Sequence, residues 1–287
     1  MLDEYLGEIA EIFDVVMILS DHGFGPQWGV LNLVKLLEKH GLIVWRKPRL
    51  KELVLRAVLG IGRRLRLGKL LPSKVRNELR SVRANMRSLV SQLDLDVSKV
   101  IIPEYTIPFG AIHVNPRFKH LRDKILMEVA DVIQNVSEEV GEENLHASIW
   151  LPKELYSGDR VELLPDLIFT VNDWSCVVTK TKDNYLYLDE PYSPRHTGSH
   201  RLHGIFIVWG KDVKNGVNMP EISILDIAPT ILHMYSAPLP SNINGRVLKD
   251  VFHPDSKFVK RKTRFVELSY YNKLRLAKKV RKIREQF

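Results

Sequence analysis

Two neighbouring residues near the start of the sequence, Asp21 and His22, have side chains of the kinds that bind transition metals. A carboxylate oxygen and an imidazole nitrogen suit zinc and similar ions. They follow Val15–Leu19, an unbroken apolar run in which β-branched residues recur. Such a run predicts a strand buried on both faces of a parallel sheet, and open α/β sheets place ligands at the carboxyl ends of such strands. The alternative is that Asp21 caps a helix and His22 lies in a surface turn.

A second candidate ligand, His200, lies in the polar, glycine-containing loop 197–201, directly before the apolar run 205–209. Arg201 beside it could contact a phosphate oxygen, because a guanidinium binds phosphate in a bidentate manner. An outward salt bridge is the alternative role for this arginine. If each loop ends a strand of one sheet, Asp21, His22 and His200 are expected to converge in space.

Four separated phrases carry a likeness to a known family: residues 20–26, 198–200, 224–232 and 245–248. Taken in this order, they resemble motifs of the alkaline phosphatase superfamily. The nearest branch is the type I phosphodiesterase/nucleotide pyrophosphatase group with its microbial phosphohydrolase relatives. The resemblance implies an α/β domain over residues 1–252, with a mostly parallel central sheet flanked by helices.

The same resemblance implies a chemistry. In that family two divalent metal ions, usually zinc, hold a phosphoric ester while a Ser or Thr attacks phosphorus. By position, Asp21 and His22 would bind the metal nearer the nucleophile, and His200 would bind the other. Manganese is the alternative metal. The substrate expected from the family is a phosphodiester or a phosphorylated small molecule.

One part of the family pattern is missing. The family's nucleophile, an early metal-binding Asp and an Asp-x-x-x-His pair all precede the Asp-His turn, and twenty residues precede it here. No Asp stands four residues before any His in the sequence. We therefore expect the chain to hold the C-terminal part of a catalytic domain that is poorly active alone. It is either truncated or one part of a split enzyme that an N-terminal companion chain completes. The alternative is a non-catalytic homologue that serves as a binding subunit.

Charge is divided unevenly along the 287 residues. Residues 46–90 carry 14 Lys or Arg against two acidic residues, and residues 257–287 carry 12 against two. Because the whole chain has a net charge of +9, the remainder is acidic, at −13. We predict a basic helical insertion at about 46–97 and a basic helical tail over 253–287. Both could face solvent or contact an anionic membrane.

Other classes of protein are disfavoured by composition. Aromatic residues are not interleaved with the basic ones as a base-stacking surface requires, which argues against nucleic acid as the partner. One cysteine, Cys176, excludes an internal disulfide framework and a cysteine-rich metal site. No apolar run approaches the length of a membrane span, and the first residues lack the pattern of a secretory signal. We expect a cytoplasmic protein, with peripheral membrane contact through the basic helices as the alternative.

Overall fold

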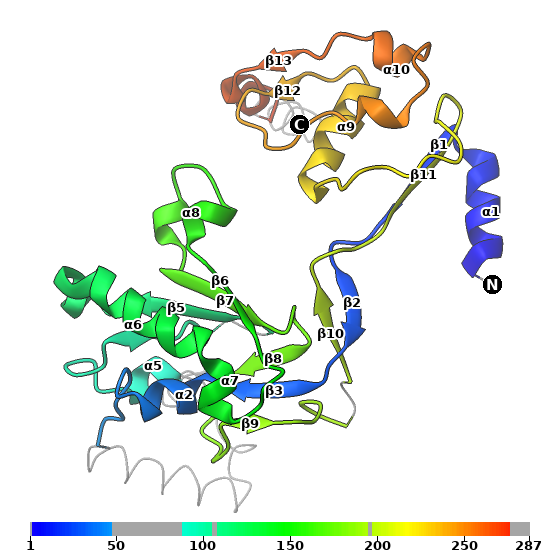
Figure 1. Cartoon of the computed structure of the whole chain (residues 1–287). Coiled ribbons are helices and arrows are strands. Elements are labelled where there is room, and N and C mark those ends of the chain that lie inside the picture. Colours follow the sequence, from blue (N-terminus) through cyan, green and yellow to red (C-terminus); the bar gives the residue numbers. More distant parts are fainter. Residues whose placement is uncertain (1, 48–87, 105–107, 195–196, 276–287) are drawn as a thin grey trace, which may run out of the picture. The chain divides into compact units, whose positions relative to one another are not determined.

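The computed structural model describes residues 2–47, 88–104, 108–194 and 197–275 (Figure 1). The chain divides into two compact units: unit 1 comprises Met1–His22 with His203–Phe287, and unit 2 comprises Gly23–Leu202. Both contain helices and strands, so the expected mixed α/β class is confirmed. Most of the predicted basic insertion and the end of the predicted tail lie outside the described residues, and their helical character stays a prediction.

Unit 2 is built on a seven-stranded sheet with the order β4-β5-β7-β8-β3-β9, in which β6 also pairs with β7. Its strands are β3 (Gly29–Asn32), β4 (Val100–Ile101), β5 (Gly110–Val114), β6 (Ala147–Trp150), β7 (Leu167–Val171), β8 (Cys176–Thr179) and β9 (Tyr187–Leu188). Within the described part of this sheet, β3 and β8 form the one parallel pair. The sheet is therefore mixed, and it is not the mostly parallel sheet that we expected. A tight turn joins β7 to β8, and so short a connection permits antiparallel pairing alone.

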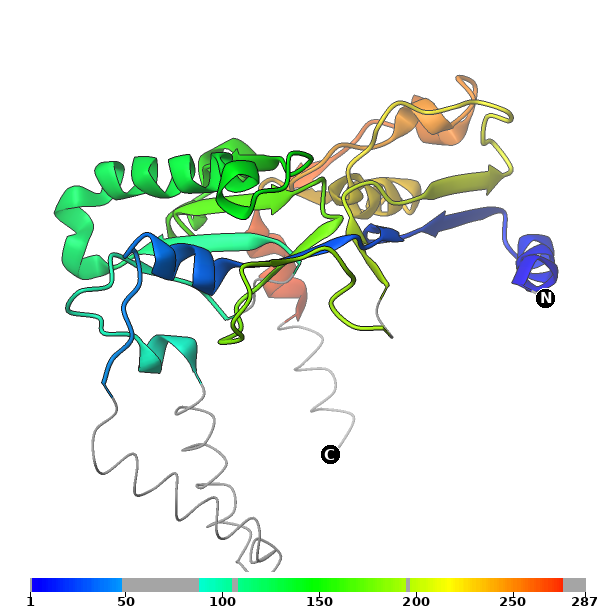
Figure 2. The ribbon, with the colours of Figure 1, turned by 60° about the horizontal axis from the view of Figure 1, so that its bottom comes forward.

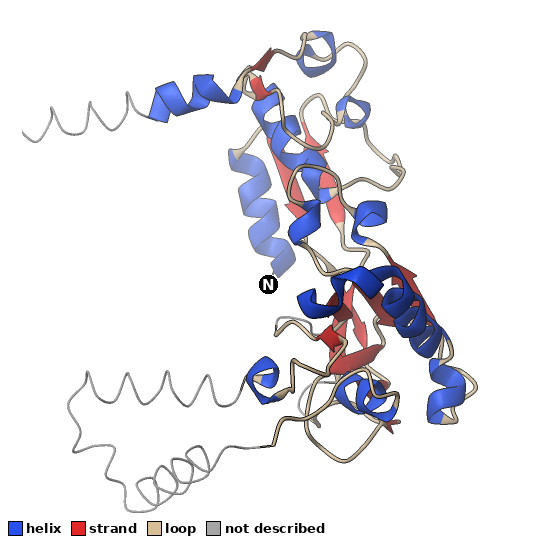
Figure 3. Ribbon diagram, turned by 90° about the vertical axis from the view of Figure 1, so that its left-hand side faces the viewer, coloured by secondary structure: helices blue, strands red, loops and turns tan. Residues whose placement is uncertain are grey.

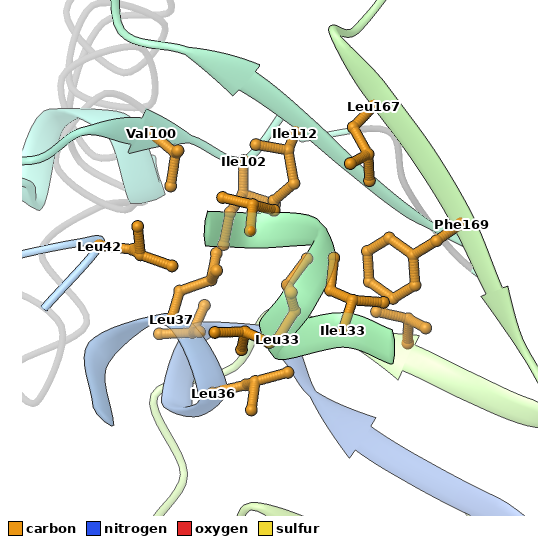
Figure 4. Packing of buried hydrophobic residues seen from close by; sticks show 14 of the residues in the cluster. Leu33, Leu36, Leu37, Leu42, Val100, Ile102, Ile112, Ile133, Leu167 and Phe169 are labelled. Atoms are coloured by element: carbon orange, nitrogen blue, oxygen red, sulfur yellow. The ribbon is translucent and has the colours of Figure 1, made fainter. Parts of the chain in front are cut away.

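Helices cover this sheet and close the larger core of the molecule. They are α2 (Leu33–Lys39), α5 (Leu89–Gln92), η2 (Pro116–Leu121), α6 (Arg122–Gln134), α7 (Val136–Val140), α8 (Pro152–Leu155) and η3 (Val161–Leu163). Figure 2 shows α6, in green, lying along the sheet. Leucines of α2 and Ile133 of α6 pack with Leu167 and Phe169 of β7, and all are fully or almost fully buried (Figure 4). Apolar burial therefore dominates the stability of unit 2.

Unit 1 contains a two-stranded antiparallel ribbon of β1 (Val15–Leu19) and β11 (Phe206–Gly210), which lie side by side in Figure 3. The first four side chains of β1 are half-buried, and that of Leu19 is exposed. The expectation that β1 is a central strand of a parallel sheet, buried on both faces, is therefore wrong. The apolar run correctly predicted a strand, but such a run specifies neither the direction of the neighbouring strand nor the number of neighbours.

The other elements of unit 1 surround a small core that includes Phe252 and Phe258. They are α1 (Leu2–Ile12), η4 (Ile224–Asp226), α9 (Ile227–Met234), β12 (Leu239–Pro240), η5 (Lys249–Val251), α10 (Lys257–Lys260) and β13 (Phe265–Val266). The described part of the predicted tail thus contains α10, β13 paired with β12, and a helix at 268–275. None of the helices in the described ranges has both the length and the apolarity to cross a membrane.

A buried carboxylate links two of the family-like phrases in unit 1. Asp226 accepts hydrogen bonds from the backbone N–H of Arg246, at 2.7 Å, and of Ser223, at 3.1 Å. The Thr230 hydroxyl donates to the Asp226 carbonyl at 2.6 Å and accepts from the N–H of Leu248 at 2.9 Å. The phrases 224–232 and 245–248 therefore hold each other in place, which is a structural role.

Candidate functional site

The Asp21–His22 pair lies directly after β1, where the ribbon of unit 1 ends. Asp21 Oδ1 and His22 Nε2 are 3.6 Å apart, and the two side chains are 80% and 38% exposed. Two ligands of one tetrahedral zinc ion, each at about 2.0–2.1 Å from it, would be about 3.3 Å apart. The two donors thus have nearly the separation that a shared cation requires, and solvent reaches both of them.

Two hydrogen bonds fix the start of this turn. Ser20 donates from its N–H to the Ile205 carbonyl at 3.1 Å, and the Ser20 Oγ accepts from the Ile205 N–H at 2.9 Å. Gly204 makes this close approach possible, because a Cβ there would overlap the Ser20 Oγ and lie 3.2 Å from the His22 carbonyl. Ser20 and Gly204 therefore position the pair, a role that the sequence did not reveal. The sequence feature that could have indicated this close approach is Gly204, the glycine that precedes the apolar run 205–209.

His200 lies on a second two-stranded antiparallel ribbon, formed within unit 2 by β2 (Gly23–Pro26) and β10 (Gly198–Arg201). It is opposite Phe24 in the register, and its side chain is exposed while that of Ser199 is buried. Because side chains alternate along a strand, His200 and Ser199 point to opposite faces of this ribbon. His200 thus lies on a paired strand and is exposed to solvent.

The guanidinium of Arg201 is held by main-chain carbonyls. Its Nη1 donates to Trp174 O at 2.9 Å and to His200 O at 2.8 Å, and its Nη2 donates to Pro26 O. Burial lowers the pKa of Arg201, an effect that the nearby Asp173 carboxylate opposes. An arginine remains charged in either case. These contacts do not test the predicted role in phosphate binding, but they favour a positioning role.

The donors fit part of a metal site. Among the residues that the structure describes, no group of three or more His, Cys, Asp or Glu side chains is arranged to hold an ion. Asp21 and His22 nevertheless provide an oxygen and a nitrogen suited to zinc or manganese. Asp21 and His22 belong to unit 1 and His200 to unit 2. The convergence of all three therefore stays a prediction.

A different histidine, His233, has a structural role. It is buried in α9, and its Nε2 lies 2.7 Å from the Phe258 carbonyl while its Nδ1 lies 3.2 Å from the Thr263 hydroxyl. With both ring nitrogens engaged by the protein, this imidazole has no free position for a metal.

Comparisons of the chain with protein-family models, with curated proteins and with solved structures found no match. Function must accordingly be argued from the motifs and from the geometry of these side chains.

Proposed function

We propose that this chain supplies metal ligands for the hydrolysis of phosphoric esters of the phosphodiesterase/nucleotide pyrophosphatase type, on a scaffold of the alkaline phosphatase superfamily. The observation that carries the proposal is the exposed Asp21–His22 donor pair, 3.6 Å apart, on a turn fixed by Ser20 and Ile205. The order of the four family-like phrases supports it. A phosphodiester or a phosphorylated small molecule is the proposed substrate class.

The side chains have distinct parts in this proposal. Asp21 would hold one cation through a carboxylate oxygen, and His22 would hold the same cation through a neutral imidazole nitrogen, so protons compete with the metal. His200 would contribute to a second cation. When bound, such ions stabilise negative charge on the phosphoryl oxygens and favour deprotonation of a nucleophile. The pre-formed turn would lower the ordering cost of binding, because Ser20 and Gly204 already fix its backbone.

The ligand set of two cations is incomplete in this sequence, which lacks the Asp-x-x-x-His pair. We assign no nucleophile to the chain. The proposal assigns the nucleophile and the remaining ligands to residues outside this sequence, either in the rest of a longer protein or in a companion polypeptide. The chain alone is therefore expected to bind zinc weakly and to hydrolyse phosphodiesters slowly.

Zinc competition with a chromophoric chelator, together with a bis(p-nitrophenyl) phosphate assay, tests this proposal. Asp21→Ala and His22→Ala should each weaken zinc binding by about 10-fold or more. Matched controls are Asp14→Ala and His253→Ala, which remove exposed residues of the same types in unit 1. Zinc affinity that depends on neither Asp21 nor His22 would overturn the proposal. Rapid hydrolysis that is lost in His200→Ala would instead show that the chain contains its own nucleophile.

The second candidate function is a non-catalytic binding subunit that contacts an anionic membrane. Its support is the charge distribution, with net charges of +12 over residues 46–90 and +10 over residues 257–287. A protein with such basic segments is attracted to anionic lipid headgroups, and the attraction weakens with salt. This function would leave the Asp21–His22 pair without a role, so the zinc experiment also separates the two candidates.

A further inference from the structure

Arg201 joins three segments of unit 2 that are far apart in the sequence. Its Nη1 donates to Trp174 O in the turn between β7 and β8, and to His200 O and Ser199 O, at 3.5 Å, in β10. Its Nη2 donates to Pro26 O at the end of β2. A guanidinium has five N–H donors in a rigid fork, so one side chain can bridge several carbonyls at once.

The space beside this guanidinium depends on a glycine. A Cβ on Gly25 would lie 2.8 Å from Arg201 Nε and 3.1 Å from Arg201 Cζ. Real Cβ atoms do not approach so closely, so any larger residue at position 25 would displace the guanidinium. Gly25, the second glycine of the Gly-Phe-Gly-Pro sequence in β2, therefore leaves room for the Arg201 side chain of β10.

The turn that Arg201 contacts has an unusual backbone. Asn172, Asp173 and Trp174 have φ values of 47°, 48° and 72°, in the left-handed region that residues other than glycine rarely adopt. Residues in this conformation are strained and persist where the surroundings hold them. Here the Asn172 side chain accepts from the His146 N–H at 2.8 Å, and Arg201 binds the Trp174 carbonyl. Arg201 thus binds a turn whose conformation is also fixed by the hydrogen bond between Asn172 and His146.

We propose that Arg201 is a positioning residue that fixes the orientation of His200 by tying β10 to the end of β2 and to the Asn172–Trp174 turn. The inference rests on the proposed function, in which His200 binds a metal. Arg201 acts on the ribbon face that carries Ser199, and His200 points to the opposite face. A tightly held strand keeps an exposed imidazole in one orientation, whereas a loose strand would have to be ordered when the metal binds.

The test uses the full chain, zinc as the probe, and the imidazole resonances of His200 in NMR spectra, assigned by comparison with His200→Gln. Zinc titrations report the affinity at His200, and amide hydrogen exchange in the metal-free chain reports the order of β2 and β10. The variants are Arg201→Lys, Arg201→Ala and Gly25→Ala. Arg117→Lys is the matched control, because Arg117 is an exposed arginine of unit 2 that pairs with Asp96 at 3.0 Å.

Arg201→Lys should weaken zinc binding at His200 by about 10-fold and speed exchange in β10, although the positive charge is kept. Gly25→Ala should do the same with the arginine intact. A direct electrostatic role predicts the opposite sign for Arg201→Ala, because removal of a nearby positive charge would strengthen cation binding.

Two further results would count against the inference, and they can be told apart. If zinc shifts the His200 resonance in the parent chain with an affinity that all three variants retain, Arg201 and Gly25 are structural residues only. If zinc does not perturb His200 in the parent chain, the role of His200 in the proposed function fails and this inference fails with it. In that second case the Asp21–His22 pair is unaffected.

Discussion

The two units of the chain are stabilised in different ways. Among the residues that the structure describes, the main core of unit 2 contains 26 buried apolar residues, whereas the core cluster of unit 1 contains five. Beside its small apolar core, unit 1 has buried polar residues such as Asp226, Thr230 and His233, each of which is hydrogen-bonded to the chain. The candidate ligands lie in neither core. Asp21 and His22 follow the end of β1, and His200 lies within β10.

This contrast separates residues that stabilise the fold from residues that could perform chemistry. Substitutions in the core of unit 2 should lower the free energy of unfolding. Substitutions of the buried polar residues of unit 1 should lower it by less. Substitutions of Asp21, His22 or His200 should change metal binding with little effect on stability, because these side chains are exposed or half-buried.

The largest effect is expected from a cavity in unit 2. Phe169 is fully buried between the sheet and the helices, so Phe169→Ala should destabilise the chain by about 3–5 kcal/mol. Ile207→Ala, in the ribbon of unit 1, should cost less than about 1 kcal/mol because Ile207 is 51% exposed. Denaturant unfolding of both variants measures the difference. Equal losses would contradict the contrast between the two units.

A smaller loss of stability is expected from substitution of Asp226, the buried carboxylate of unit 1. Asp226→Ala would leave the N–H groups of Ser223 and Arg246 without their acceptor, at a cost of about 2–3 kcal/mol. Asp226→Asn keeps one acceptor and should cost less. The control is Asp250→Ala, which removes an exposed i,i+4 pair with Arg246 and should cost at most about 0.5 kcal/mol. Thermal unfolding that ranks Asp250→Ala as the more damaging change would be inconsistent with this account.

An ion pair in unit 2 predicts a pH dependence. The Lys39 ammonium, 2.6 Å from the Glu139 carboxylate, lowers the pKa of Glu139 below its ordinary value of 4.5, and His40 adds to the effect against the opposing influence of burial. A depressed folded-state pKa stabilises the fold above the unfolded-state pKa, and this stabilisation is lost as the pH falls through the folded-state value.

Glu139→Gln should therefore be less stable than the parent chain near pH 7, by at most about 1 kcal/mol. The difference should begin to decrease as the pH falls below about 4.5 and should vanish below the lower folded-state pKa of Glu139. Urea unfolding of both proteins between pH 3 and 7 measures it. A difference that grows as the pH falls from about 4.5 to 3 would have the wrong sign and would rule out the Lys39–Glu139 pair as its source.

The last prediction concerns membrane binding by the end of the basic tail, residues 276–287, which lies outside the described residues. A chain ending at Arg275 keeps Phe258 and β13, which belong to unit 1. If the end of the tail contacts membranes, this shorter chain should bind anionic liposomes less than the full chain at low salt, and added salt should reduce the difference. Sedimentation with and without anionic lipid measures this. Equal binding by both chains would exclude residues 276–287 as the membrane contact, and no binding by either would leave the basic residues as solvated surface.

Local features of the fold could be predicted from the sequence, and long-range ones could not. The strand predicted at Val15–Leu19 is confirmed. The direction of the strand that pairs with β1 is set by residues some 190 positions later, and the expected parallel neighbour was wrong.

The candidate site shows the same division. Asp21 and His22 could be identified because the donors are adjacent in the sequence. The carbonyl partners of Arg201 could not, because they come from Pro26 and Trp174, and no side-chain pattern marks a carbonyl as an acceptor. The role of Gly204 depends on its approach to Ser20 across the ribbon, which likewise requires the fold.

The most direct test of the central claim, that Asp21 and His22 bind one divalent ion, is zinc X-ray absorption on the zinc-loaded chain. The account predicts a shell of oxygen and nitrogen ligands at about 2.0–2.1 Å without sulfur, with imidazole scattering that decreases in His22→Ala and is unchanged in His253→Ala. Imidazole scattering of equal strength in the parent chain and in His22→Ala would contradict it.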